Sequence, residues 1–307
     1  MDNNAKSVTQ VNNTPEWLKR FLEESEREGN NFALMGSRML RQKARSIVWY
    51  ISEKFNCHRN GIPGQACCIV EWYIVYVMRK QSNLEESAIA RVVLEYIRPR
   101  MLLIMACSIV LAAKMNSAML PVTATATRTV LALEGFLFSI NEVVCMEMEI
   151  LKALEFRVPL MTSVEVGEML AHELAVQPQV LPAVTKLIDM AELCRYDVEK
   201  VVRWVARSRG LSNCDTRVRT LHLAAGGVAA AVKTASNMIG VSEKLATMLQ
   251  VPTGYIKCLR DIIVTETAKE RPHIDKPLAT LQRKRKNNDD DCSRPPSPRP
   301  STSRDPY

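Results

Sequence analysis

Apolar residues recur along most of this chain at the three- and four-residue spacing of helices that bury one face. The clearest case follows Ser139, and its apolar positions are Val143, Met146, Ile150, Leu151 and Leu154. Ser139 and Glu142 are three residues apart and fit a capping box, in which each side chain satisfies a free backbone amide at a helix start. The same spacing places Glu147 on the apolar stripe, where a carboxylate needs a cation or an open end of the bundle.

Two stretches are apolar nearly all round, from Cys67 to Lys80 and from Met101 to Lys114. Helices without a polar face belong in the middle of a helical bundle, so we expect both to be central. The apolar run Met101–Ala113 falls short of the roughly 20 residues that cross a bilayer, and we expect no membrane partner. The charge of Lys114 must lie at the surface end of its helix or pair with a carboxylate.

Further helices are predicted on both sides of a boundary near residue 160. One holds Val130 to Leu137, and a second capping box, Thr162 with Glu165, precedes the next helix. The later helices are expected at Val164–Leu174, Leu181–Val205, Arg217–Ile239, Ser242–Leu249 and Thr253–Glu266. Small residues at 224–231 should let neighbouring helices approach closely.

The pattern therefore predicts an all-α protein built from two consecutive helical bundles. We expect a disordered tail at 1–13, an N-terminal helix at 14–31, a first domain at 32–160 and a second, divergent domain at 161–270. A disordered basic and proline-rich tail is expected at 271–307.

Composition agrees with this class, since 47% of the 307 residues are hydrophobic while only 6% are aromatic and 11 are glycine. Such a chain can bury real cores and favours packed helices over many short strands. Most of the nine cysteines lie in apolar helical stretches, and no secretory signal opens the sequence. They read as reduced core residues of a cytosolic or nuclear protein.

Much of the formal net charge of +8 is local to the C-terminal tail. Arg283, Lys284, Arg285 and Lys286 form a basic cluster that could be a nuclear import signal or a solvated charge run. Ser297 precedes a proline and could be a proline-directed phosphorylation site, although such dipeptides also occur in tails by chance.

Catalytic and metal-binding patterns are not found in the sequence. The four histidines are scattered, and no cysteine or histidine pairs recur at zinc-finger spacing. No Walker loop, dinucleotide glycine motif, Gly-x-Ser-x-Gly or kinase signature occurs. We therefore expect no enzymatic activity, no cofactor and no metal site, and any phosphoryl transfer would come from a partner.

Two segments resemble the cyclin family. Ala106–Lys114 is similar to the alanine-and-lysine end of the third helix of a cyclin box, and Glu142–Pro159 is similar to the fifth helix and its exit. The resemblance implies two cyclin-box-like bundles and a cyclin-dependent kinase as partner. It also implies that Lys114 and Glu147 lie side by side and hold the kinase near its mobile regulatory helix. Without the resemblance, the two residues would read as a solvated helix end and its internal ion-pair partner.

Within the cyclins, the sequence resembles a divergent branch that promotes meiotic crossover maturation. The supporting segments are Ser52–Phe55, Glu142–Pro159 and Leu223–Val232. This resemblance implies a nuclear protein. It also leaves open that the protein associates with chromosomes and binds meiotic recombination proteins.

Two departures from common cyclins bear on these expectations. The segment between Lys114 and Glu147 is longer and lacks the acidic residues that usually follow the lysine, so kinase docking could be altered or lost. Ala44–Trp49 matches the substrate-docking patch only in part.

Two other functions therefore stay open, a DNA-binding transcription factor with cyclin-like folds and a scaffold that binds no kinase. Direct nucleic-acid binding is not expected, because the basic excess is concentrated in the tail.

Overall fold

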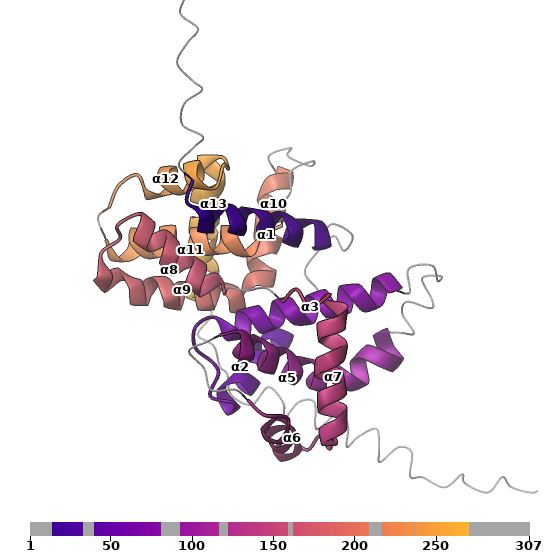
Figure 1. Cartoon of the computed structure of the whole chain (residues 1–307). Coiled ribbons are helices and arrows are strands. Elements are labelled where there is room, and N and C mark those ends of the chain that lie inside the picture. Colours follow the sequence, from indigo (N-terminus) through magenta and orange to yellow (C-terminus); the bar gives the residue numbers. More distant parts are fainter. Residues whose placement is uncertain are drawn as a thin grey trace, which may run out of the picture.

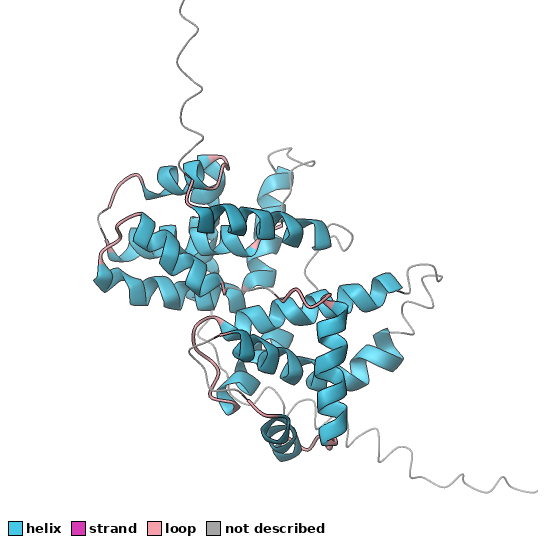
Figure 2. Ribbon diagram, in the orientation of Figure 1, coloured by secondary structure: helices cyan, strands magenta, loops and turns pink. Residues whose placement is uncertain are grey.

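The computed structural model describes residues 14–32, 40–80, 93–116, 122–158, 162–208, 217–236 and 238–269. These residues form helices joined by turns and loops, and no strand occurs among them (Figure 2). The all-α class predicted from the sequence is thus confirmed for the described part of the chain.

The N-terminal bundle extends from Leu40 to Val158 and shares one hydrophobic core. Its elements are α2 (Gln42–Lys54), α3 (Ile62–Lys80), the π-helical turn η2 (Val93–Ile97), α5 (Arg98–Met115), α6 (Ala124–Leu133) and α7 (Ile140–Ala153). Both helices predicted to be central, α3 and α5, are buried on nearly all sides. Pro99 lies in the first turn of α5, where its missing amide costs no hydrogen bond.

The helix expected from Val130 to Leu137 ends earlier than predicted. α6 stops at Leu133, and Gly135 then adopts a left-handed φ of 82°. Glycine takes this conformation without the steric cost that a Cβ would impose, so the chain turns here. Leu137 consequently lies outside any helix and is 87% exposed.

The C-terminal bundle is formed by the described residues of the ranges 162–208, 217–236 and 238–269, and α1 (Glu16–Phe32) packs onto it as an added helix (Figure 1). Its elements are α8 (Ser163–Glu173), the short 3-10 helix η3 (Pro178–Val180), α9 (Leu181–Leu193), α10 (Arg195–Ser208), α11 (Thr220–Ala235), α12 (Val241–Met248) and α13 (Thr253–Lys269). α1 inserts Leu18 and Phe21 into the same core as α8 and α11. The amphipathic N-terminal helix is therefore anchored by burial rather than by its own propensity.

The single helix predicted from Leu181 to Val205 is wrong, because the chain divides there into α9 and α10. Cys194 ends α9 with φ −87° and ψ 7°, and Arg195 begins α10 with its side chain only 1% exposed. Apolar spacing continues through the break, so periodicity alone could not locate it. Burial of Arg195 among carboxylates fixes the change of direction.

The small residues of α11 allow close helix contacts, as predicted. A Cβ added to Gly226 would lie 2.7 Å from Leu259 Cγ of α13, and one on Gly227 would lie 2.4 Å from Ile188 Cγ1 of α9. Both distances are too short for real Cβ contacts. α11 is accordingly the central helix of the C-terminal bundle.

The continuous helical segment Glu95–Met115 is long and apolar enough to cross a membrane by length and composition alone. In this fold, however, 72% of its apolar window is buried inside the protein. The segment thus packs here as the core helix that the sequence predicted.

Candidate partner-binding site

The C-terminal end of α5 and the middle of α7 meet at the surface of the N-terminal bundle. The residues of α5 are buried from Leu102 to Ala113, and Lys114 in its last turn is the next residue and is exposed. α7 begins at the predicted capping box, in which the Ser139 hydroxyl accepts from the Glu142 amide and the Glu142 carboxylate accepts from the Ser139 amide. This cap fixes the start of α7 and hence the position of Glu147, two turns later.

Lys114 and Glu147 are direct neighbours in the folded chain, although 33 residues separate them in sequence. Lys114 Nζ donates to Glu147 Oε2 at 2.5 Å. The lysine side chain is 40% exposed and the glutamate side chain 12%. The pair therefore lies at the edge of the core, with the cation toward solvent and the carboxylate largely covered.

The second carboxylate oxygen of Glu147, Oε1, is buried and has no hydrogen-bond partner among the described residues. A buried acceptor without a donor costs free energy, on the order of 1–3 kcal/mol. The Cys107 thiol lies close by, donating to the carbonyl oxygen of Val143, and burial first and Glu147 second raise its pKa. The thiol therefore stays protonated and adds no negative charge beside Glu147.

Apolar side chains surround this pair on the solvent side. Ile140, Val144 and Met148 follow one another at four-residue spacing on α7 and are 39%, 49% and 44% exposed. Met115, beside Lys114, is 41% exposed. We call Lys114, Met115, Val144, Glu147 and Met148 the α5–α7 rim. The rim thus combines a partly covered ion pair with exposed apolar side chains.

Two tyrosines hold α7 in place on the opposite side of the helix. Tyr73 of α3 and Tyr96 of η2 both donate to Glu149 Oε1, at 2.6 and 2.5 Å. Burial first, and then the hydrogen bond to Glu149, raise the pKa of both hydroxyls, so both remain donors at neutral pH. The sequence analysis did not find this contact, since tyrosine spacing alone does not reveal a shared acceptor.

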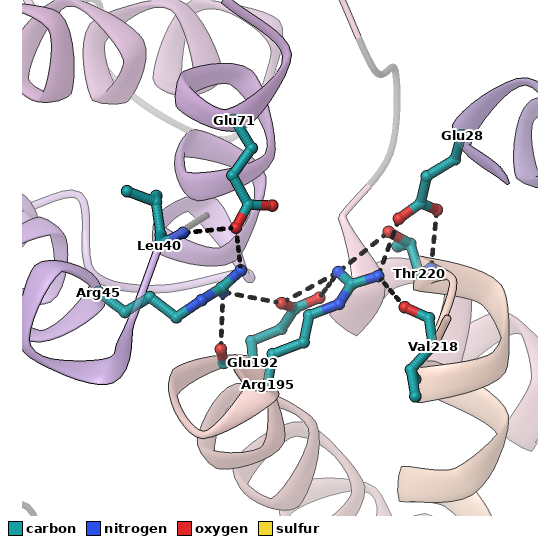
Figure 3. A network of polar contacts seen from close by, with 8 residues as sticks. All are labelled: Glu28, Leu40, Arg45, Glu71, Glu192, Arg195, Val218 and Thr220. Atoms are coloured by element: carbon teal, nitrogen blue, oxygen red, sulfur yellow. Dashed lines mark hydrogen bonds and ion pairs between the residues drawn. The ribbon is translucent and has the colours of Figure 1, made fainter. Parts of the chain in front are cut away.

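A buried ionic network joins the two bundles and α1 (Figure 3). Its charged members are Glu28, Arg45, Glu71, Glu192 and Arg195. Arg195 donates from Nη2 to Glu28 Oε1 at 2.8 Å and from Nη1 to Glu192 Oε1 at 3.0 Å. These charges were missed from the sequence. The available signal was an arginine inside an apolar helical pattern, as at Arg45, because a buried charge requires partners.

Arg45 belongs to the segment that matched the substrate-docking patch in part. Its side chain is 1% exposed and donates to Glu71 Oε1 at 3.2 Å. Ile47 and Val48 are also buried. These three residues serve the core, which leaves them unavailable to a docking peptide in this conformation.

The other predicted site residues, Arg283, Lys284, Arg285, Lys286 and Ser297, lie outside the described residues. Within the described ranges, no group of three or more histidine, cysteine, aspartate or glutamate side chains could hold a metal ion.

Comparison with solved structures identifies the fold. The X-ray structure of a viral cyclin from Herpesvirus saimiri matches with a TM-score of 0.52, over 82% of this chain and 100% of that chain, at 14% sequence identity. At this identity the likeness shows the fold alone, and that fold is the cyclin fold predicted from the sequence. No protein-family model and no curated protein matches the sequence.

Proposed function

We propose that this chain is a cyclin-like regulatory or scaffolding subunit that binds a cyclin-dependent kinase through the α5–α7 rim. The observation that carries the proposal is the buried, unpartnered Oε1 of Glu147 beside Lys114. Lys114, whose side chain is 40% exposed, could donate to a partner carbonyl. A movement of the Lys114 side chain would uncover the Glu147 carboxylate, which could then accept from a backbone amide of a partner helix. The exposed Val144 and Met148 would supply the apolar area of the contact.

Binding would act on the kinase by a population shift. A subunit that contacts the active arrangement of a kinase better than the inactive one raises the share of the active arrangement. The proposed contact with the kinase's mobile regulatory helix follows from the resemblance of the two rim segments to a cyclin box. Since the fold has no catalytic role in this scheme, the partner would supply the phosphoryl transfer.

Charge reversal at the rim tests the proposal. The kinase would first be identified by affinity purification of the full-length protein from germline tissue and then used in a pull-down with purified chains. We expect Lys114→Glu and Glu147→Lys each to reduce kinase capture by about tenfold or more, because charge-assisted contacts to the partner are lost.

The double variant, Lys114→Glu with Glu147→Lys, separates an interface from an internal ion pair. It restores the attraction between α5 and α7 with the charges exchanged, but it presents the reversed pattern to the kinase. An interface predicts that capture stays lost, whereas a purely internal pair predicts that capture returns. Kinase capture that survives in the double variant would therefore reject this surface.

The meiotic role is a finer part of the same proposal. The segments Ser52–Phe55, Glu142–Pro159 and Leu223–Val232 resemble cyclin N-terminal domain-containing protein 1, which promotes crossover maturation. We propose that this chain acts likewise in the nucleus, with Arg283–Lys286 as its import signal. Deletion of that cluster should redistribute a fluorescent fusion to the cytoplasm, and an unchanged nuclear signal would contradict the assignment.

DNA binding is the second candidate function, and one observation on α10 supports it. Lys200, Trp204 and Arg207 are exposed along one face of α10, and Trp204 is 68% exposed. Cations flanking an accessible aromatic ring can bind phosphates and stack on bases. A gel shift with the full chain, repeated with Trp204→Ala, decides this: salt-sensitive binding that the substitution weakens would favour the DNA-binding function.

A further inference from the structure

We infer that a groove between α1, α3 and the end of α7 binds the phosphoryl group of a phosphorylated peptide. The groove has a volume of about 150 Å³. It is lined by Arg27, Trp72, Val75, Tyr76, Arg79, Ala153, Leu154, Glu155 and Arg157. None of these residues belongs to the α5–α7 rim. The inference therefore does not depend on kinase binding.

The charge of the lining favours an anion. Three arginines, Arg27, Arg79 and Arg157, line the groove together with a single carboxylate, that of Glu155. Outside the lining, Glu24 forms an ion pair with Arg27 at 3.8 Å. Arg157 is exposed and has no ion pair with any described residue. Guanidinium groups offer planar pairs of donors that match phosphate oxygens, so clustered arginines are the usual phosphate readers.

Two buried donors in the lining have no acceptor among the described residues. They are Nε of Arg27 and Nε1 of Trp72. Arg27 also lies over the Trp72 ring, with its guanidinium carbon 5.7 Å from the ring centroid. Buried N–H groups without an acceptor are costly, and an anionic ligand with several oxygens would satisfy such groups.

The backbone at the end of α7 directs Arg157 toward this groove. Glu155 and Phe156 both have left-handed φ values, of 51° and 57°. Neither is a glycine, so two consecutive residues store strain in this turn. The Phe156 amide donates to the Leu151 carbonyl and the Arg157 amide to the Leu154 carbonyl, both at 2.8 Å, which closes the turn.

A phosphoryl group fits this lining better than a carboxylate does. It carries about −1.5 to −2 charges at neutral pH and three strong acceptor oxygens, against one charge and two oxygens for a carboxylate. The lining residues themselves, three arginines and Glu155, carry a formal charge of +2, and Arg157 contributes a cation that no described carboxylate pairs with. Val75, Tyr76 and Leu154 would contact the peptide next to its phosphorylated residue.

The test uses the full-length protein and two peptide libraries with random flanks, one with a fixed phosphoserine and one with glutamate in its place. Fluorescence anisotropy of selected peptides should show binding of the phosphoserine form about tenfold or more tighter than of the glutamate and unphosphorylated forms. In a nitrogen-15 NMR spectrum, the Trp72 indole signal, assigned with Trp72→Phe, should shift with the phosphopeptide.

Arg157→Ala is the diagnostic variant, because an exposed arginine can be removed without loss of core packing. We expect it to weaken phosphopeptide binding by about tenfold or more, whereas Arg128→Ala, which removes an exposed arginine on α6, leaves binding unchanged. Equal binding of the three peptide forms, no binding of any library member, or phosphate-dependent binding that survives Arg157→Ala together with Arg79→Ala would overturn the inference. Kinase capture is measured separately, so failure here leaves the rim proposal standing.

Discussion

Arg45 of α2 donates from Nη1 to the backbone carbonyl oxygen of Glu192 in α9 at 2.8 Å, across 147 residues of sequence. The same guanidinium donates from Nη2 to Glu71 of α3. One side chain thus links the core of the N-terminal bundle to the helix end that precedes Arg195. Because both the arginine and its carboxylate partners are buried, the two bundles are tied by charges that water does not screen.

Replacing Arg45 by methionine should destabilise the protein by about 3–5 kcal/mol, because the buried carboxylate of Glu71 would lose its arginine partner. Urea unfolding followed by circular dichroism measures the change. The double variant Arg45→Met with Glu71→Leu provides the control, since removal of both charges should recover much of the loss. A single variant that loses less than about 1 kcal/mol would show that Glu71 finds other compensation.

Asp189 of α9 should make stability depend on pH. Burial, and then the nearby Glu192 and Glu168, raise the pKa of this carboxyl to about 7 in the folded protein. Its unfolded pKa is about 3.9, so the folded state binds an extra proton between these values and stability falls as pH rises from about 4 to about 7. Below the unfolded pKa the penalty is absent, and above about pH 7 it is constant.

Asp189→Asn should therefore stabilise the protein at pH 8 by on the order of 4 kcal/mol, at about 1.36 kcal/mol for each of about three pKa units, and leave it unchanged near pH 4. The difference in unfolding free energy between the two proteins, measured across this range, isolates Asp189 from the other titrating groups. A difference that does not change with pH would mean that the carboxyl keeps its ordinary pKa in the folded protein.

Gly227→Ala should destabilise the C-terminal bundle by about 1–3 kcal/mol, because the new Cβ would overlap Ile188 at 2.4 Å. Thermal unfolding measures the effect. Gly254→Ala is the matched control at the start of α13, where an added Cβ meets nothing within 4 Å. The control should be neutral or slightly stabilising, as alanine favours helix. Equal effects of the two substitutions would refute the close packing of α9 against α11.

Thr162→Ala should cost about 1 kcal/mol by removing the second capping box. In the folded protein the Thr162 hydroxyl accepts from the Glu165 amide at 3.1 Å, and the Glu165 carboxylate accepts from the Thr162 amide at 2.8 Å. Thr162→Ser keeps the hydroxyl and should retain most of the stability. Chemical unfolding of both variants makes the comparison, and a serine variant as unstable as the alanine variant would point to lost packing of the threonine methyl instead.

The candidate site was only partly accessible to sequence reasoning. Glu147 was placed on the apolar stripe of its helix by spacing, and the charge of Lys114 required an exit or a carboxylate. That the two meet came from a family resemblance, because periodicity describes one helix at a time. The groove with Arg27, Trp72 and Arg157 was not predicted, because its members come from α1, α3 and the turn after α7, and no local pattern describes how these segments pack together.

The sequence by itself determined the helical class, the two capping boxes, the central position of α3 and α5, and the close helix approach that the small residues at 224–231 allow. These features depend on local hydrogen bonds and on which face of a helix is apolar, and both follow directly from the order of residues along the chain. Tertiary structure alone decided the break at Cys194, the inward turn of Arg195 and the pairing of Arg45 with Glu71 and Glu192. A buried charge is stabilised only by groups brought to it through folding, and here those groups lie up to 167 residues away, as Glu28 does from Arg195.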